Sequence, residues 1–155
     1  MSVIQFDHLS AEERSLLYTT PALVTYLIGG ADGNFDTKEE VQSSHFIRIH
    51  SADGDPILFD FYKHVETTYF DVLDAVVKQY EHTSVKERTD SIIAELEKLN
   101  EVLQKVDNLY ARVLIKSLRS LAKVVAEASG GVLGFLEVGY EEEQLMGLEM
   151  ITYQP

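Results

Sequence analysis

One stretch of the chain, residues 59–80, reads FDFYKHVETTYFDVLDAVVKQY. Its apolar positions recur at steps of three or four residues, which places them on one face of an α-helix and fits no strand, where the period is two. This stretch predicts a long helix with a buried face, and it sets the expectation of an all-α protein. The positions are Tyr62, Val65, Tyr69, Leu73, Val76 and Tyr80.

The same spacing continues behind Ser84, which forms a helix-opening capping pattern with Glu87. We expect two helices in this region, joined at Asp107-Asn108, and the second of them ends at Gly130-Gly131 because glycine suits the end of a helix. Residues 141–151 leave room for a last short helix. The apolar positions here are Ile92, Leu96, Leu99, Leu103, Val106, Tyr110, Val113, Leu121, Val125 and Ala128, with Ser117 as the one polar member.

The N-terminal part carries two further helix predictions. Ser10 and Glu13 form a capping box that opens a short helix, expected to run to about Tyr18. Pro21 lacks an amide N–H, so it is expected to stand in the first turn of a second helix that Thr20 caps. That second helix ends at residues 29–30, which are both glycine.

A similar pattern, Asp36 with Glu39, predicts a helix that runs toward His50. An alternative for the following region is a β-hairpin that pairs residues 46–49 with residues 57–59 around the turn at 51–56, since both segments are short and apolar. The helical pattern is favoured. Together these elements predict a compact, single-domain, all-α helical bundle over residues 1–155.

Composition narrows the classes of function. The chain has 155 residues, with 13 Lys and Arg against 26 Asp and Glu, and a formal charge of −13. Such a surface repels phosphate backbones, so nucleic-acid binding is not expected. No cysteine is present, which excludes disulfides and thiol catalysis. The sequence shows no signal peptide and no apolar stretch of about 18 residues, so we expect a cytoplasmic protein without membrane insertion.

The segment most suggestive of a binding site is the acidic turn before the helix that Asp36 opens. Asp32, Asn34 and Asp36 supply oxygens at steps of two, as the first positions of an EF-hand loop do, and hard divalent cations bind such oxygens. The EF-hand pattern then fails, because Thr37 and Ser43 stand where glycine and a bidentate glutamate are required. A purely structural role is the alternative: the acids cap the helix and form the turn.

A weak internal repeat extends this candidate site. The order helix, small-residue turn, helix start recurs around residues 128–142, giving two quasi-repeated helix-turn-helix motifs. Aligned at their ends, Asp32 falls on Ser129 and Glu39 falls on Glu142. If the two copies pack together, Glu142 approaches the first turn and completes a divalent-cation site. Two similar turns with no shared ligand remain the alternative. The candidate metal ligands are Asp32, Asn34, Asp36, Glu39 and Glu142.

Two segments carry a resemblance to a known family. Residues 27–39, LIGGADGNFDTKE, resemble the Ala-Asp-Gly-containing first motif of the tellurite-resistance TerB-like family. Residues 118–131, followed by 138–142, resemble its alanine- and glycine-rich second motif. The resemblance implies a compact helical fold of an uncharacterised bacterial protein, a place in stress response and an acidic metal-binding face, with no known reaction. Ser129 and Gly139 depart from the acidic or hydroxyl pattern, which argues against symmetric binding of two metals.

The resemblance implies acidic site residues that coincide with four of the ligands named above: Asp32, Asp36, Glu39 and Glu142. The cation expected there is calcium, magnesium, manganese or zinc. No nucleophile elbow, P-loop or dinucleotide fingerprint occurs in the chain, so the expected function is non-enzymatic. A hydrolase that uses Asp32 and Glu142 is the least favoured interpretation.

A competing interpretation rests on a row of basic residues, Arg112, Lys116, Arg119 and Lys123, which we call the basic stripe. Their steps of four, three and four place them on one side of a helix. A metal-independent interaction module would use this stripe to bind a protein partner. The alternative is a solvated face that pairs with the chain's own surplus carboxylates.

Overall fold

The computed structural model describes residues 3–130 and 140–154, and it leaves the side chain of Glu142 undescribed. The described residues form helices joined by turns and loops, with no strand among them, so the all-α prediction is confirmed. Their helices, in chain order, are η1 (Ile4–Phe6), α1 (Ala11–Gly29), α2 (Thr37–His50), η2 (Pro56–Leu58), α3 (Phe59–Gln79), α4 (Val85–Glu97), α5 (Leu99–Leu103), α6 (Asn108–Ala128) and α8 (Glu142–Met146).

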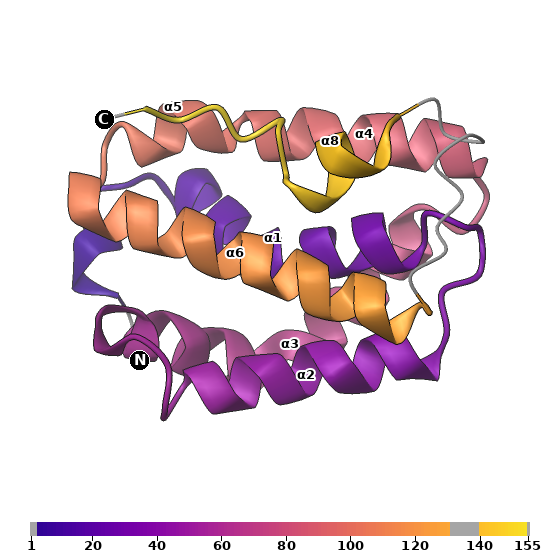
Figure 1. The fold of residues 1–155 in the computed structure, drawn as a ribbon. Coiled ribbons are helices and arrows are strands. Elements are labelled where there is room, and N and C mark those ends of the chain that lie inside the picture. Colours follow the sequence, from indigo (N-terminus) through magenta and orange to yellow (C-terminus); the bar gives the residue numbers. More distant parts are fainter. Residues whose placement is uncertain (1–2, 131–139, 155) are drawn as a thin grey trace.

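Helix α1 lies at the centre of this arrangement (Figure 1). It packs against α3, α4 and α6, while α2 packs against α3 and α6. The four tyrosines of the apolar pattern, at positions 62, 69, 80 and 110, are all buried in the resulting core, as their spacing predicts. The polar member of that pattern also has a role there, because Ser117 of α6 shares a hydrogen bond with the buried Tyr62 hydroxyl of α3.

The predicted break at Pro21 is wrong, because α1 runs without interruption from Ala11 to Gly29. Thr20 does not cap a new helix, and its hydroxyl instead donates to the Leu16 carbonyl at 2.7 Å. An interior proline costs a helix about 3 kcal/mol. Leu17, Leu23 and Ile28 lie on both sides of Pro21 and are buried, and each stabilises the fold by roughly 1.5–3 kcal/mol. Tertiary packing therefore outweighs the local penalty.

The single helix predicted between Ser84 and Asp107 is wrong, because the chain is divided at Lys98 into α4 and α5. Other boundaries follow the sequence closely. Helix α3 begins at the predicted residue, Asp107 caps α6, and α8 lies in the segment predicted to hold a last helix. The hairpin alternative is wrong, since residues 46–49 belong to α2 and residues 56–58 form the 3-10 helix η2. Among the described residues, no helix combines the length and apolar character needed to cross a membrane.

One capping prediction fails in an informative way. The Ser10 capping box forms in full. At the start of α2, by contrast, Asp36 accepts a hydrogen bond from the Lys38 amide at 2.9 Å, and Glu39 does not complete the box. Glu39 is buried. The side chain that the sequence assigned to the helix cap is therefore placed in the interior, and this defines the candidate site.

Candidate functional site

Three helix ends meet around Glu39. The residue lies in the first turn of α2, and the Ser129 hydroxyl at the end of α6 donates to its Oε1 at 3.0 Å. At the end of α1, a Cβ added to Gly29 would stand 2.8 Å from the Glu39 Cγ, so only glycine leaves room for this side chain. Figure 1 shows the same convergence, with α6 ending beside the start of α2. The site thus joins residues that are 90 positions apart in the chain.

The Glu39 carboxyl is incompletely satisfied. The residue is 2% exposed, and its Oε2 atom has no hydrogen-bond partner among the described residues. Burial raises the pKa of Glu39, and the adjacent Asp36 carboxylate raises it further. The adjacent Glu39 carboxyl, followed by the hydrogen bond from the Lys38 amide, lowers the pKa of Asp36. Two acidic side chains in contact need a shared proton or a cation between them.

The electrostatic field of the nearby helix ends also favours a positive charge beside Glu39. The carbonyl end of a helix carries about half a negative charge, and the last turn of α6 contains no basic residue to offset it. The end of α1 is different, because Arg88 of α4 donates to the Gly30 carbonyl there. The start of α2 contributes the opposite sign, but only as a partial charge beside the full charge of Asp36. The net electrostatic potential at Glu39 is therefore negative.

The structure brings two of the five predicted ligands together, Asp36 and Glu39. Asp32 is exposed, and its Oδ1 accepts the Asn34 amide at 2.9 Å, so these two residues form the turn that the structural alternative predicts. Gly33 takes a left-handed conformation at φ 84° to close that turn. Glu142 begins α8, but its side chain lies outside the described part of the structure. Val138 and Gly139 of the internal repeat also lie outside the described residues.

Sequence reasoning missed Ser129 as a member of the site. The internal repeat aligned this residue with Asp32, yet its hydroxyl was not counted as a ligand because the pattern is acidic. The structure places this hydroxyl against the Glu39 Oε1 atom. Within residues 3–130 and 140–154, no cluster of three or more His, Asp or Glu side chains is close enough to hold a metal ion.

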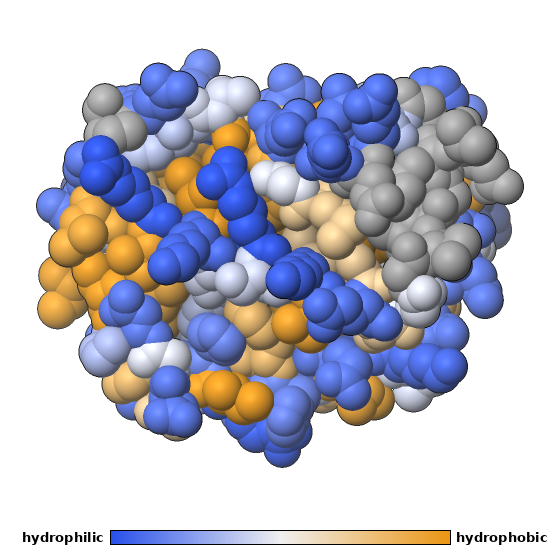
Figure 2. Space-filling model, in the orientation of Figure 1, coloured by the Kyte–Doolittle hydropathy of each residue, from blue (hydrophilic) through white to orange (hydrophobic). Residues whose placement is uncertain are grey.

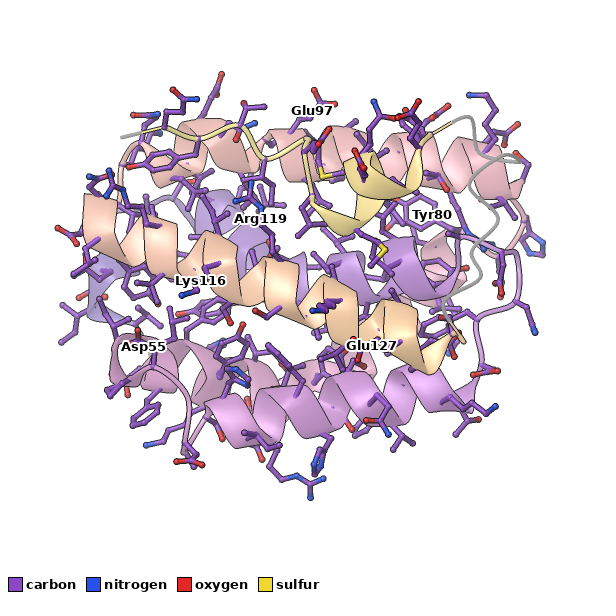
Figure 3. All side chains as sticks on the ribbon, in the orientation of Figure 1. Asp55, Tyr80, Glu97, Lys116, Arg119 and Glu127 are labelled. Carbon is purple, nitrogen blue, oxygen red and sulfur yellow. The ribbon has the colours of Figure 1, made fainter. Side chains whose placement is uncertain are left out.

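The four residues of the basic stripe do not share one role in the fold. Arg119 donates from Nε to the Gly147 carbonyl at 2.8 Å and from its guanidinium to the Ile151 carbonyl at 3.4 Å, so it anchors the C-terminal segment. Arg112, Lys116 and Lys123 are exposed, and none of them forms an ion pair with a described carboxylate. The pairing expected for a solvated stripe is therefore not seen among these residues. Figure 3 shows Lys116 and Arg119 on successive turns of α6.

In comparisons with protein-family models, curated proteins and solved structures, the chain matches none of them.

Proposed function

We propose that this protein is a non-enzymatic, TerB-like protein that binds a divalent cation between Asp36 and Glu39. One observation carries the proposal: the buried Oε2 atom of Glu39 has no hydrogen-bond partner among the described residues and lies beside a second carboxylate. A buried unpaired carboxylate is costly. A cation bridging the two carboxylates removes that cost, and the uncompensated carbonyl end of α6 favours it further.

The donor set favours a small, hard cation. Two carboxylates and the Ser129 hydroxyl leave about half of an octahedral shell to water, which Mg²⁺ tolerates well because it keeps several of its waters. Ca²⁺ prefers six to eight oxygen ligands, and Zn²⁺ prefers nitrogen or sulfur. Under the proposed quasi-repeat, Glu142 at the start of α8 supplies a further carboxylate. We therefore rank Mg²⁺ and the chemically similar Mn²⁺ ahead of Ca²⁺ and Zn²⁺.

The cation would act by joining helices. Glu39 belongs to α2, and Ser129 closes α6, so an ion at this position holds the first turn of α2 against the end of α6. Removal of the ion leaves like charges in contact and loosens that junction. We propose that this change alters a surface used by a protein partner, in keeping with the stress-response role that the TerB resemblance implies.

Thermal unfolding with and without added cations tests the proposal. A ligand present at 100 times its Kd stabilises the folded state by about 2.7 kcal/mol, which corresponds to roughly 8 °C for a domain of this size. We expect such a shift with Mg²⁺ or Mn²⁺ in the wild-type protein, and we expect its loss in Asp36→Asn and Glu39→Gln. Glu40→Gln, which removes the neighbouring carboxylate of the same helical turn, is the matched control. The proposal fails if no cation raises the Tm, or if Glu39→Gln responds as the wild type does.

A further inference from the structure

A second surface lies along the edge of α6, at the pocket between α6 and the segment that joins α2 to α3. The pocket has a volume of about 170 Å³. Sites for cofactors and other small molecules usually measure about 300–1,000 Å³, so this pocket has room for one side chain rather than for such a ligand. Leu58 and Val113 give it apolar walls, and Lys116 and Ser120 border it on α6.

The wall opposite α6 is held in place by His50. Its ring stacks on Phe46 with the centroids 3.8 Å apart, and its Nδ1 hydrogen-bonds to the Phe46 carbonyl at 2.9 Å. A carbonyl only accepts, so Nδ1 carries the hydrogen and Nε2 is the ring nitrogen left to accept an N–H from a bound chain. Gly54 packs against the ring, since a Cβ there would lie 2.8 Å from the His50 Cδ2. The pocket is therefore preformed.

The charges beside the pocket are not paired within the described part of the chain. Four lysines elsewhere pair with the chain's own carboxylates, Lys78 with Asp74, Lys86 with Asp90, Lys98 with Glu95 and Lys105 with Glu13, whereas Lys38 and Lys63 form no ion pair with a described carboxylate. Arg112 and Lys116 have no such partner among the described carboxylates, although the chain carries twice as many acids as bases. Their charges are thus available to carboxylates of another molecule.

Apolar surface continues beyond the pocket. Leu109, on the first turn of α6, is 61% exposed, and Figure 2 shows apolar surface at the end of the molecule where α6 begins. Hydrophilic side chains cross the same face along α6. Apolar side chains and unpaired positive charges therefore lie next to each other on this surface. The protein as a whole has a formal charge of −13 and repels anions.

We propose that an acidic peptide segment of a partner protein docks along α6, with one leucine-like side chain in the pocket and its carboxylates on Arg112 and Lys116. Charge complementarity favours this occupant, because Arg112 and Lys116 lie one turn apart on the exposed side of α6 and Lys116 lines the pocket. Asp55 lies on the wall facing Lys116 (Figure 3), where it accepts the Ile57 amide at 3.1 Å. Its carboxylate confines the peptide's acids to the α6 side. This interaction is independent of the cation site.

The test measures binding of a labelled synthetic peptide, in which several glutamates flank one leucine, by fluorescence anisotropy at low salt. Reversal of two exposed charges in Arg112→Glu/Lys116→Glu is expected to weaken binding about tenfold. Arg48→Glu/Lys63→Glu changes the net charge equally at exposed sites outside the basic stripe and is expected to leave the Kd within about twofold. Asp55→Asn is expected to tighten binding, because it removes the opposing carboxylate.

Three outcomes would overturn the proposal. If both double variants weaken binding equally, only the overall charge matters and no site exists on α6. If a peptide with serine in place of leucine binds equally well, the pocket takes no side chain. Single-stranded RNA serves as a polyanion without an apolar side chain, and RNA binding as tight as the peptide's would mark a general anion surface instead. Circular dichroism spectra establish that each variant is folded.

Discussion

The most direct prediction concerns Glu39→Gln in the absence of cations. The substitution keeps an oxygen that accepts the Ser129 hydroxyl, and it places an amide N–H₂ where the unpartnered Oε2 stands. That amide donates to the Asp36 carboxylate, so two groups that repel each other become donor and acceptor. We therefore expect the variant to be more stable than the wild type at neutral pH in the presence of a chelator.

The magnitude follows from the burial of the group. A buried polar atom without a partner costs about 1–3 kcal/mol, and more when it is charged, whereas a hydrogen bond to a charged group contributes about 1.5–3 kcal/mol. The wild type avoids part of this cost by holding a proton, because the pKa of Glu39 is raised. We expect a net gain of about 1–3 kcal/mol in the free energy of unfolding, with a Tm increase of roughly 3 °C per kcal/mol.

Urea unfolding, followed by far-UV circular dichroism in a chelator, measures the gain. Glu39→Ala is the companion variant, because it removes both the charge and the acceptor of the Ser129 hydroxyl and leaves a cavity. We expect Glu39→Gln to be the more stable of the two. If Glu39→Gln is instead less stable than the wild type, the fold already satisfies the carboxylate, and neither the cation nor the argument from its unpartnered oxygen stands.

Two further predictions follow from polar contacts elsewhere in the fold. The hydrogen bond from Lys105 holds the pKa of Glu13 at about 2, below its ordinary 4.5. The unfolded chain therefore binds more protons between these values, so stability is lost as the pH falls from 4.5 toward 2; an acid titration of Glu13→Gln should show a shallower loss. Ser117→Ala leaves the buried Tyr62 hydroxyl without its partner and should lower the free energy of unfolding, measured in urea, by about 1–3 kcal/mol. Adding Tyr62→Phe to this variant should recover most of the lost stability. Equal losses in the single and double variants would contradict the role assigned to this hydrogen bond.

The sequence was a good guide wherever structure depends on near neighbours. The three- and four-residue spacing of residues 59–80 predicted α3, and Ser10 and Asp107 mark helix starts that the structure confirms. Pro21 was misleading because its penalty is local, whereas the burial that outweighs it comes from helices elsewhere in the chain. Propensity alone cannot weigh the two effects.

The candidate site likewise depends partly on near neighbours in the sequence and partly on distant helices. The sequence by itself determined that acids gather after the Gly29-Gly30 pair, that Asp36 begins a helix, and that the surface is strongly negative, because these properties depend on composition and on residues within one helical turn. Only the tertiary structure decided that Glu39 faces inward to Ser129 and that Arg119, but neither Arg112 nor Lys116, holds the C-terminal segment. Burial and pairing of a charged group depend on which distant helices pack against it, and that information is absent from any single stretch of the chain.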